Sequence, residues 1–149
     1  MHQEFLTVQE LLHYALETPG HQGKGIYVVG SVTNELAGKI SFSTGLQVAG
    51  YRVTIDHSAI IHTLRQHGQA MEVLRGQITV TEADLLDLAE WLASPTQVTD
   101  AGQIKGQLQC LRFEKTTSFA RFVAIMEVRT RKERQQLALK TLYKKRPTA

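Results

Sequence analysis

The spacing of apolar residues changes along the chain. In the first two thirds, apolar residues recur every three or four positions, which is the spacing that forms one face of an α-helix. Segments of this kind lie at residues 7–17, 31–45, 58–68 and 81–92. In the last third, apolar and polar residues alternate, which is typical of strands with one buried face.

Residues with known capping preferences mark the ends of these helices. Thr7 and Thr81 are each followed three positions later by an acidic residue, which is the spacing of a capping box. Pro19 follows the first helix, Gly68 ends the third and Pro95 closes the fourth. Glycine and proline are common just after a helix, so these positions predict where the helices stop.

The alternating segments predict three strands, separated by the turn-prone TTSFA and the charged RKERQ. They occupy residues 107–115, 121–130 and 136–145. A further short strand is expected at 26–30, and residues 45–56 are expected to form an extended link. Helices followed by consecutive strands define an α+β domain with an antiparallel sheet, and we predict one domain over residues 1–149.

Composition limits the class of protein. With 149 residues, 42% of them apolar, the chain is large enough for one hydrophobic core. It has no run of about 18 apolar residues and no basic segment at its start, so neither a membrane span nor a signal peptide is predicted. The single Cys110 excludes an internal disulfide, and its apolar surroundings favour a place in the core over a nucleophilic role.

Charge is unevenly distributed, although the net charge is only +3. Residues 129–146 are rich in Lys and Arg and contain the single acid Glu133, whereas residues 78–90 contain four acids and no base. A basic surface suits a polyanion, because each neutralised phosphate releases a condensed counterion. On charge alone, a solvated tail that aids solubility explains the pattern equally well.

Two histidines lie on the third predicted helix. His62 and His67 are five positions apart, so they project about 140° from each other. This spacing is poor for a shared metal, but it allows both side chains to line one cleft at the helix end. Taken singly, His62 is better explained as a partly buried structural histidine, and His67 as a residue stabilised by the helix dipole.

The last two predicted strands turn polar toward one end. Alternation places Glu127 and Arg129 on one face of the first of them. On the second strand, the residues expected to share a face are Leu137, Leu139, Thr141 and Tyr143. Lys140 should then face away from Thr141 unless a bulge intervenes. A rim ion pair and a boundary aromatic would explain these residues individually, but beside the histidines they describe a possible cleft.

Such a set of residues fits cleavage of RNA without a metal. A base removes the proton of the 2′-OH, an acid protonates the leaving 5′-oxygen, and fixed donors hold the charged phosphorane. Histidine can serve as acid or base because its usual pKa is near 6.5. Arg129 offers a bidentate fork for phosphate, Thr141 adds a hydroxyl donor, and Tyr143 can stack on a base. A protein that only binds RNA would fit the same residues.

The order of these segments resembles a known family. The strings TIDHSAIIHTLRQHG, RGQITVTEADLLDLAEWLASP, FEK, MEVRT and LALKTLYKK together resemble the phage-associated branch of the Barnase–EndoU–colicin–RelE (BECR) superfamily of toxin nucleases, found at the C-termini of MuF-type phage polymorphic toxins. With weaker similarity upstream, the resemblance covers residues 28–145. It implies N-terminal helices packed on a four-stranded antiparallel sheet, endoribonuclease activity without metal or other cofactor, and an immunity protein that blocks the active site.

The resemblance also assigns roles to particular residues. The residues expected to be catalytic are His62, His67, Arg129, Thr141 and Tyr143, with the acid and the base not assigned between the histidines. Glu127 and Lys140 are expected to support them. The basic residues expected to bind RNA are Lys144, Lys145 and Arg146.

The predicted function is therefore that of an endoribonuclease toxin whose product ends in a 2′,3′-cyclic phosphate. We expect it to act on transfer RNA or other RNA in the bacterial cytoplasm, as the C-terminal module of a larger toxin delivered by a phage or by secretion. One alternative is an inactive RNA-binding or phage structural module. Another is a metal-dependent DNase, for which the acids at residues 82–90 give little support, because they fit a solvated helix face.

Overall fold

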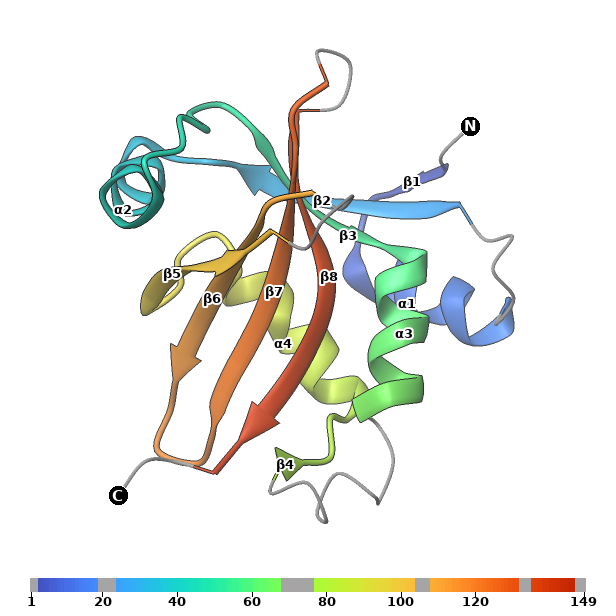
Figure 1. The fold of residues 1–149 in the computed structure, drawn as a ribbon. Coiled ribbons are helices and arrows are strands. Elements are labelled where there is room, and N and C mark those ends of the chain that lie inside the picture. Colours follow the sequence, from blue (N-terminus) through green and yellow to red (C-terminus); the bar gives the residue numbers. More distant parts are fainter. Residues whose placement is uncertain (1–2, 19–23, 68–76, 104–107, 132–134, 147–149) are drawn as a thin grey trace.

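A computed structural model describes residues 3–18, 24–67, 77–103, 108–131 and 135–146 (Figure 1). Within these residues the helices are α1 (Val8–Glu17), α2 (Asn34–Thr44), α3 (His57–His67) and α4 (Glu82–Trp91). The strands are β1 (Gln3–Phe5), β2 (Gly25–Ser31), β3 (Arg52–Asp56), β4 (Gln77–Ile78), β5 (Gln97–Gly102), β6 (Cys110–Thr116), β7 (Arg121–Arg129) and β8 (Gln136–Lys145). No helix in this part of the chain is long and apolar enough to cross a membrane.

The four predicted helices are confirmed, together with their N-terminal caps. Thr7 and Thr81 each accept a hydrogen bond from the backbone N–H three residues later. At Thr81 the capping box is complete, because the Asp84 side chain accepts in return from the Thr81 N–H. Pro19 and Gly68 lie outside the described residues, so their predicted roles at the helix ends stay predictions.

The sheet differs from the four-stranded antiparallel sheet that was expected. Its strand order is β1-β2-β3-β8-β7-β6-β5, with β4 paired to the far end of β8. Strands β5 to β8 are antiparallel neighbours, but β3 joins β8 in parallel and β1 joins β2 in parallel. The α+β class is therefore right, and the four-stranded antiparallel sheet is wrong because the N-terminal strands extend the sheet and make it mixed.

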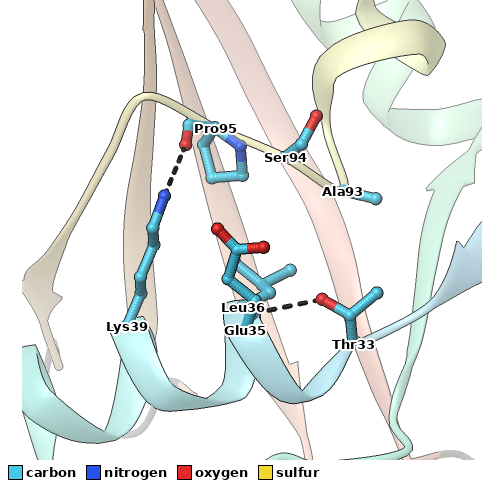
Figure 2. Close-up of a pocket in the computed structure, with 7 residues that line it drawn as sticks. All are labelled: Thr33, Glu35, Leu36, Lys39, Ala93, Ser94 and Pro95. Carbon is cyan, nitrogen blue, oxygen red and sulfur yellow. Dashed lines mark hydrogen bonds between the residues drawn. The ribbon is translucent and has the colours of Figure 1, made fainter.

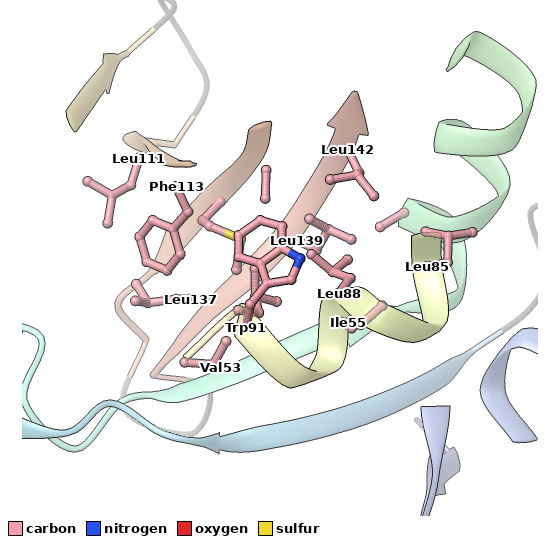
Figure 3. Close-up of a cluster of buried hydrophobic side chains, with 14 of the residues drawn as sticks. Val53, Ile55, Leu85, Leu88, Trp91, Leu111, Phe113, Leu137, Leu139 and Leu142 are labelled. Carbon is pink, nitrogen blue, oxygen red and sulfur yellow. The ribbon is translucent and has the colours of Figure 1, made fainter. Parts of the chain in front are cut away.

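One face of the sheet is covered by α4 and forms the core. Trp91 and Leu88 of α4 lie against apolar side chains of β3, β6 and β8 (Figure 3). These strand residues include Val53, Ile55, Leu111, Phe113, Leu137, Leu139 and Leu142, all at most 2% exposed. Cys110, at 9% exposed, is buried as predicted, but it pairs with Glu127 and so lies on the opposite face of the sheet, outside this cluster.

Helix α2 covers the outer edge of the sheet at β5. The Ser43 hydroxyl donates to the carbonyl oxygen of Val98 at 3.0 Å, and the Lys39 ammonium donates to that of Pro95 at 3.4 Å. A pocket of about 170 Å³ remains between the start of α2 and the turn that leads to β5 (Figure 2). Covering an edge strand in this way prevents it from pairing with another chain.

Strand β8 contains a bulge that alters its faces. Ile125 of β7 pairs with Thr141, but the next residue, Met126, pairs with Leu139, so Lys140 is the extra residue. As a result Leu139 faces the core, whereas Thr141 and Tyr143 share the opposite face. The prediction that Thr141 and Tyr143 share a face with Leu137 and Leu139 is wrong for this reason.

The same point in β8 marks a change of neighbour. Before the bulge, Gln136–Ala138 pair with β3; beyond it, α3 lies beside the strand (Figure 1). The backbone N–H of Leu142 donates to the buried Thr63 hydroxyl of α3 at 3.1 Å. This bond holds α3 against β8 just past the bulge.

Candidate active site

A pocket of about 290 Å³ opens between α3 and the strands β7 and β8. Five polar side chains line it, and four of them were predicted as site residues: His62, Glu127, Arg129 and Lys140. Ser58, Ala59 and Leu139 complete its wall. Helix, strand and bulge thus bring together residues that lie up to 82 positions apart in the sequence (from 58 to 140).

Arg129 is held in place by three acceptors. Its Nε donates to Glu127 Oε1 at 3.1 Å, one terminal nitrogen donates to Asp56 Oδ2 at 2.9 Å, and the other donates to Gln136 Oε1 at 3.4 Å. Asp56 and Gln136 are 7% and 4% exposed, so these contacts are shielded from water. The guanidinium is therefore fixed before any ligand binds.

The charge of Arg129 is secured by the same contacts. Desolvation alone would lower the pKa of Arg129, but the charge of Asp56 and the hydrogen bonds to Asp56 and Glu127 outweigh it, so the pKa is raised. Removing one partner of such a shielded ion pair leaves the other charge uncompensated. The network therefore keeps the Arg129 guanidinium charged, with Asp56 and Glu127 as its counter-charges.

Asp56 is a residue of this network that the sequence analysis missed. It is the last residue of β3 and directly precedes α3, and its second oxygen, Oδ1, is buried without a hydrogen-bond partner among the described residues. In the sequence it stands within TIDH, inside a segment expected to be an extended link. An acidic residue in an otherwise apolar stretch was the available clue, but only the pairing of β3 with β8 brings it to Arg129.

His62 is suited to accept a proton at neutral pH. It is exposed on α3, and its pKa is lowered first by partial desolvation and then by the nearby positive groups of His67, Lys140 and Arg65. A lowered pKa means that the imidazole stays neutral to more acidic pH than an unperturbed histidine. Neutral imidazole is the form that acts as a base.

Lys140 reaches the pocket because of the bulge. As the extra residue of the bulge in β8, it does not follow strict alternation, and its exposed side chain lines the same wall as Glu127 and Arg129. Lys140 was expected to face away from Thr141 unless a bulge intervened, and the bulge is present. Lys140 thus adds a second cation on the strand side of the pocket.

His67 and Tyr143 form a separate pair farther along. Their ring centroids are 5.6 Å apart, and the Lys145 ammonium lies 5.5 Å from the Tyr143 ring centroid. His67 is about 7.5 Å farther along the helix axis than His62, and neither His67 nor Tyr143 lines the pocket. The structure therefore does not place the two histidines side by side.

Thr141 lies between these two groups. It pairs with Ile125 on the same sheet face as Glu127, and its hydroxyl is buried without a hydrogen-bond partner among the described residues. Buried hydroxyls normally have partners. The Thr141 hydroxyl is thus an exception to this rule, and it lies close to the bulge.

The basic residues at the end of β8 do not form one surface. Lys144 binds Asp84 of α4 at 2.7 Å and lies over the Phe122 ring, on the core side of the sheet. Lys145 lies over Tyr143, and Arg146 is exposed. Of the three predicted RNA contacts, Lys144 is thus engaged in holding α4.

The fold and the pocket together define the class of protein. An α+β domain that places an imidazole, a carboxylate and two cations around one pocket is suited to acid–base chemistry on a phosphate ester. A family model described as phage-Barnase-EndoU-ColicinE5/D-RelE like nuclease 3 matches residues 29–149. The chain belongs to this nuclease family, as the resemblance indicated, and so to enzymes that cleave nucleic acid. No curated protein and no solved structure matches it significantly.

Proposed function

We propose that this chain is a metal-independent endoribonuclease toxin that cleaves RNA by attack of the 2′-OH on the neighbouring phosphate. The observation that carries the proposal is the convergence of His62, Glu127, Arg129 and Lys140 on one pocket. These groups supply a proton acceptor and fixed positive charge, which are the parts that such a reaction needs. A metal is not required, because the nucleophile is part of the substrate.

Arg129 would bind the scissile phosphate. A guanidinium has five N–H donors. Three of its nitrogens each donate to one protein acceptor within the described residues, so two N–H groups are available to the phosphate. Donors fixed in advance stabilise the extra charge of the phosphorane without a cost of reorganisation. Lys140, on the same wall, would add to this stabilisation.

His62 would be the base and His67 the acid. A neutral His62 takes the 2′-OH proton as the oxygen attacks phosphorus, and a protonated His67 gives a proton to the 5′-oxygen as the P–O bond breaks. The lowered pKa of His62 supports its assignment as the base. Tyr143, whose ring centroid lies 5.6 Å from that of His67, would orient the nucleotide on the leaving side, and Thr141, whose hydroxyl is buried, would support the strand between the two groups.

The biological part of the proposal follows from this chemistry. An RNA-cleaving module harms a cell that contains it, so a toxin of this kind needs a cognate immunity protein in the cell that makes it. We propose that the substrate is transfer RNA or other RNA of the bacterial cytoplasm. Lys145 and Arg146 would contact its backbone, since Lys144 is paired with Asp84.

The test uses purified chain and a mixed RNA substrate in the presence of a chelator. We expect cleavage by the wild type, products ending in 2′,3′-cyclic phosphate, and loss of cleavage in the His62→Ala variant. His13→Ala is the matched control, because His13 lies exposed on α1, outside the candidate site, where it pairs with Glu17. Intact RNA with the wild type would support the inactive RNA-binding alternative, and cleavage of DNA that a chelator abolishes would support a metal-dependent DNase.

A further inference from the structure

A second pocket adjoins the candidate active site at Arg129. It has a volume of about 330 Å³ and is lined by Leu108, Arg129, Thr130 and Arg131. Arg129 also lines the first pocket, so the same residue belongs to both walls. A chain whose phosphate is bound at Arg129 would thus have its next unit at the mouth of the second pocket.

The chemistry of this pocket differs from that of the first. Among the described residues that line it there is no histidine and no carboxylate, but there is an apolar side chain, Leu108, which is 44% exposed, and an exposed cation, Arg131. Nucleobases have apolar faces that stack on flat or apolar side chains and on guanidinium planes. An apolar wall beside a cation is therefore a surface for a base and its phosphate, not for acid–base catalysis.

The wall is attached to the active-site strand. The backbone N–H of Val128, one residue before Arg129, donates to the carbonyl oxygen of Gln109 at 2.9 Å. The Gln109 side chain in turn donates to Asp100 of β5 at 2.6 Å. These bonds connect Gln109, the neighbour of Leu108, to both β7 and β5 just before β6 begins.

From these observations we infer that the pocket lined by Leu108, Thr130 and Arg131 is a nucleotide subsite next to the scissile phosphate. Leu108 supports the base, and Arg131 binds the phosphate that follows it. The inference rests on the proposed function, because it takes Arg129 as the ligand of the scissile phosphate. It predicts that this nuclease prefers a substrate with one more nucleotide than the two that flank the cleaved bond.

The experiment compares a dinucleotide with trinucleotides that are extended by one nucleotide on either side. In the wild type, kcat/KM should rise about tenfold for one of the two extensions, which is the scale of one base-stacking contact. Leu108→Ala and Arg131→Ala should each remove most of this gain and leave the dinucleotide unchanged. Leu16→Ala is the matched control, since Leu16 is also 44% exposed but lies on α1.

Failure of the subsite can be separated from failure of the proposed function. If both variants affect the dinucleotide and the trinucleotides equally, or affect neither, the subsite is wrong although the enzyme is active. If nothing is cleaved, binding of the 2′-deoxy trinucleotides is measured instead, because these lack the nucleophile. If Leu108→Ala binds these trinucleotides more weakly than the wild type and Leu16→Ala does not, the subsite is supported even though the chain is inactive. Unchanged binding by Leu108→Ala overturns the subsite.

Discussion

The two faces of strands β7 and β8 differ in what they do for the molecule. On the side of α4, Ala124, Met126 and Leu137 are completely buried. On the opposite side, neighbouring positions of the same strands carry Glu127 and Arg129, each with a side chain that is 25% exposed. One face therefore supplies the hydrophobic burial that stabilises the fold, and the other supplies groups that are costly to desolvate.

This difference shows how a small domain can hold a charged site rigidly. Burying an ion pair often adds little net stability, because desolvation offsets the attraction between the charges. The bonds from Arg129 to Asp56 and Gln136 are thus better explained by their effect on position than by their effect on folding. Substitutions on the pocket face should therefore lower activity more than stability, and substitutions on the α4 face should lower stability more than activity.

The largest expected effect on activity is that of Arg129→Lys. Lysine keeps the charge but loses the planar fork, so cleavage should fall about 10²–10³-fold, as when one fixed donor to the transition state is removed. The melting temperature should change little. The matched control is Arg112→Lys, which also removes an Arg–Glu bond, here to Glu114 on β6, outside the pocket. Equal losses of activity in both variants would contradict the role of Arg129.

The largest expected effect on stability is that of Leu137→Ala on the core face. Removing a completely buried leucine side chain should lower the free energy of unfolding by about 2–5 kcal/mol. Below the melting transition, kcat should equal that of the wild type, because Leu137 does not line the pocket. Chemical denaturation and steady-state cleavage measure the two quantities. A large drop in kcat of the folded variant would mean that the two faces are not independent.

A smaller effect is expected for Asp56→Asn, which tests the positioning of Arg129. The loss of the charged hydrogen bond at 2.9 Å should lower kcat about tenfold and leave KM almost unchanged. Asp87→Asn, on the exposed side of α4, is the control. A rise in KM without a fall in kcat would indicate that Asp56 affects binding of the ground state instead.

The smallest expected effect is on the pH profile. Since the base must be neutral and the pKa of His62 is lowered, the acidic limb of kcat/KM should lie below pH 6.5. Lys140→Gln removes a positive charge that contributes to this lowering, so the limb should move toward higher pH. A limb that stays in place in Lys140→Gln would show that another group is the base.

The sequence predicted the local features of the fold well and the long-range ones poorly. The caps at Thr7 and Thr81 were predictable because a cap depends on residues three positions apart. The parallel pairing of β3 with β8 joins Arg52 to Gln136, and no periodicity within either segment reports such a pair. Strand β5, whose residues are mostly exposed, has no clear alternation, and it was missed for that reason.

The same distinction holds for the candidate site. Glu127 and Arg129 were expected on one face by simple alternation, and their registers with Ala138 and Gln136 agree with that. Alternation failed at Lys140, because a bulge depends on the match between two strands and not on one of them. Asp56 was missed because its partner lies 73 positions away in the sequence.

The central claim is that the 2′-OH of the substrate is the nucleophile. Its most direct test is a DNA oligonucleotide with a single ribonucleotide, incubated with the chain in the presence of a chelator and analysed by mass spectrometry. If the 2′-OH attacks, there is one cut, directly 3′ of the ribonucleotide, and it leaves a 2′,3′-cyclic phosphate. Cuts at deoxyribonucleotides, or a product with a plain 5′-phosphate, would contradict it.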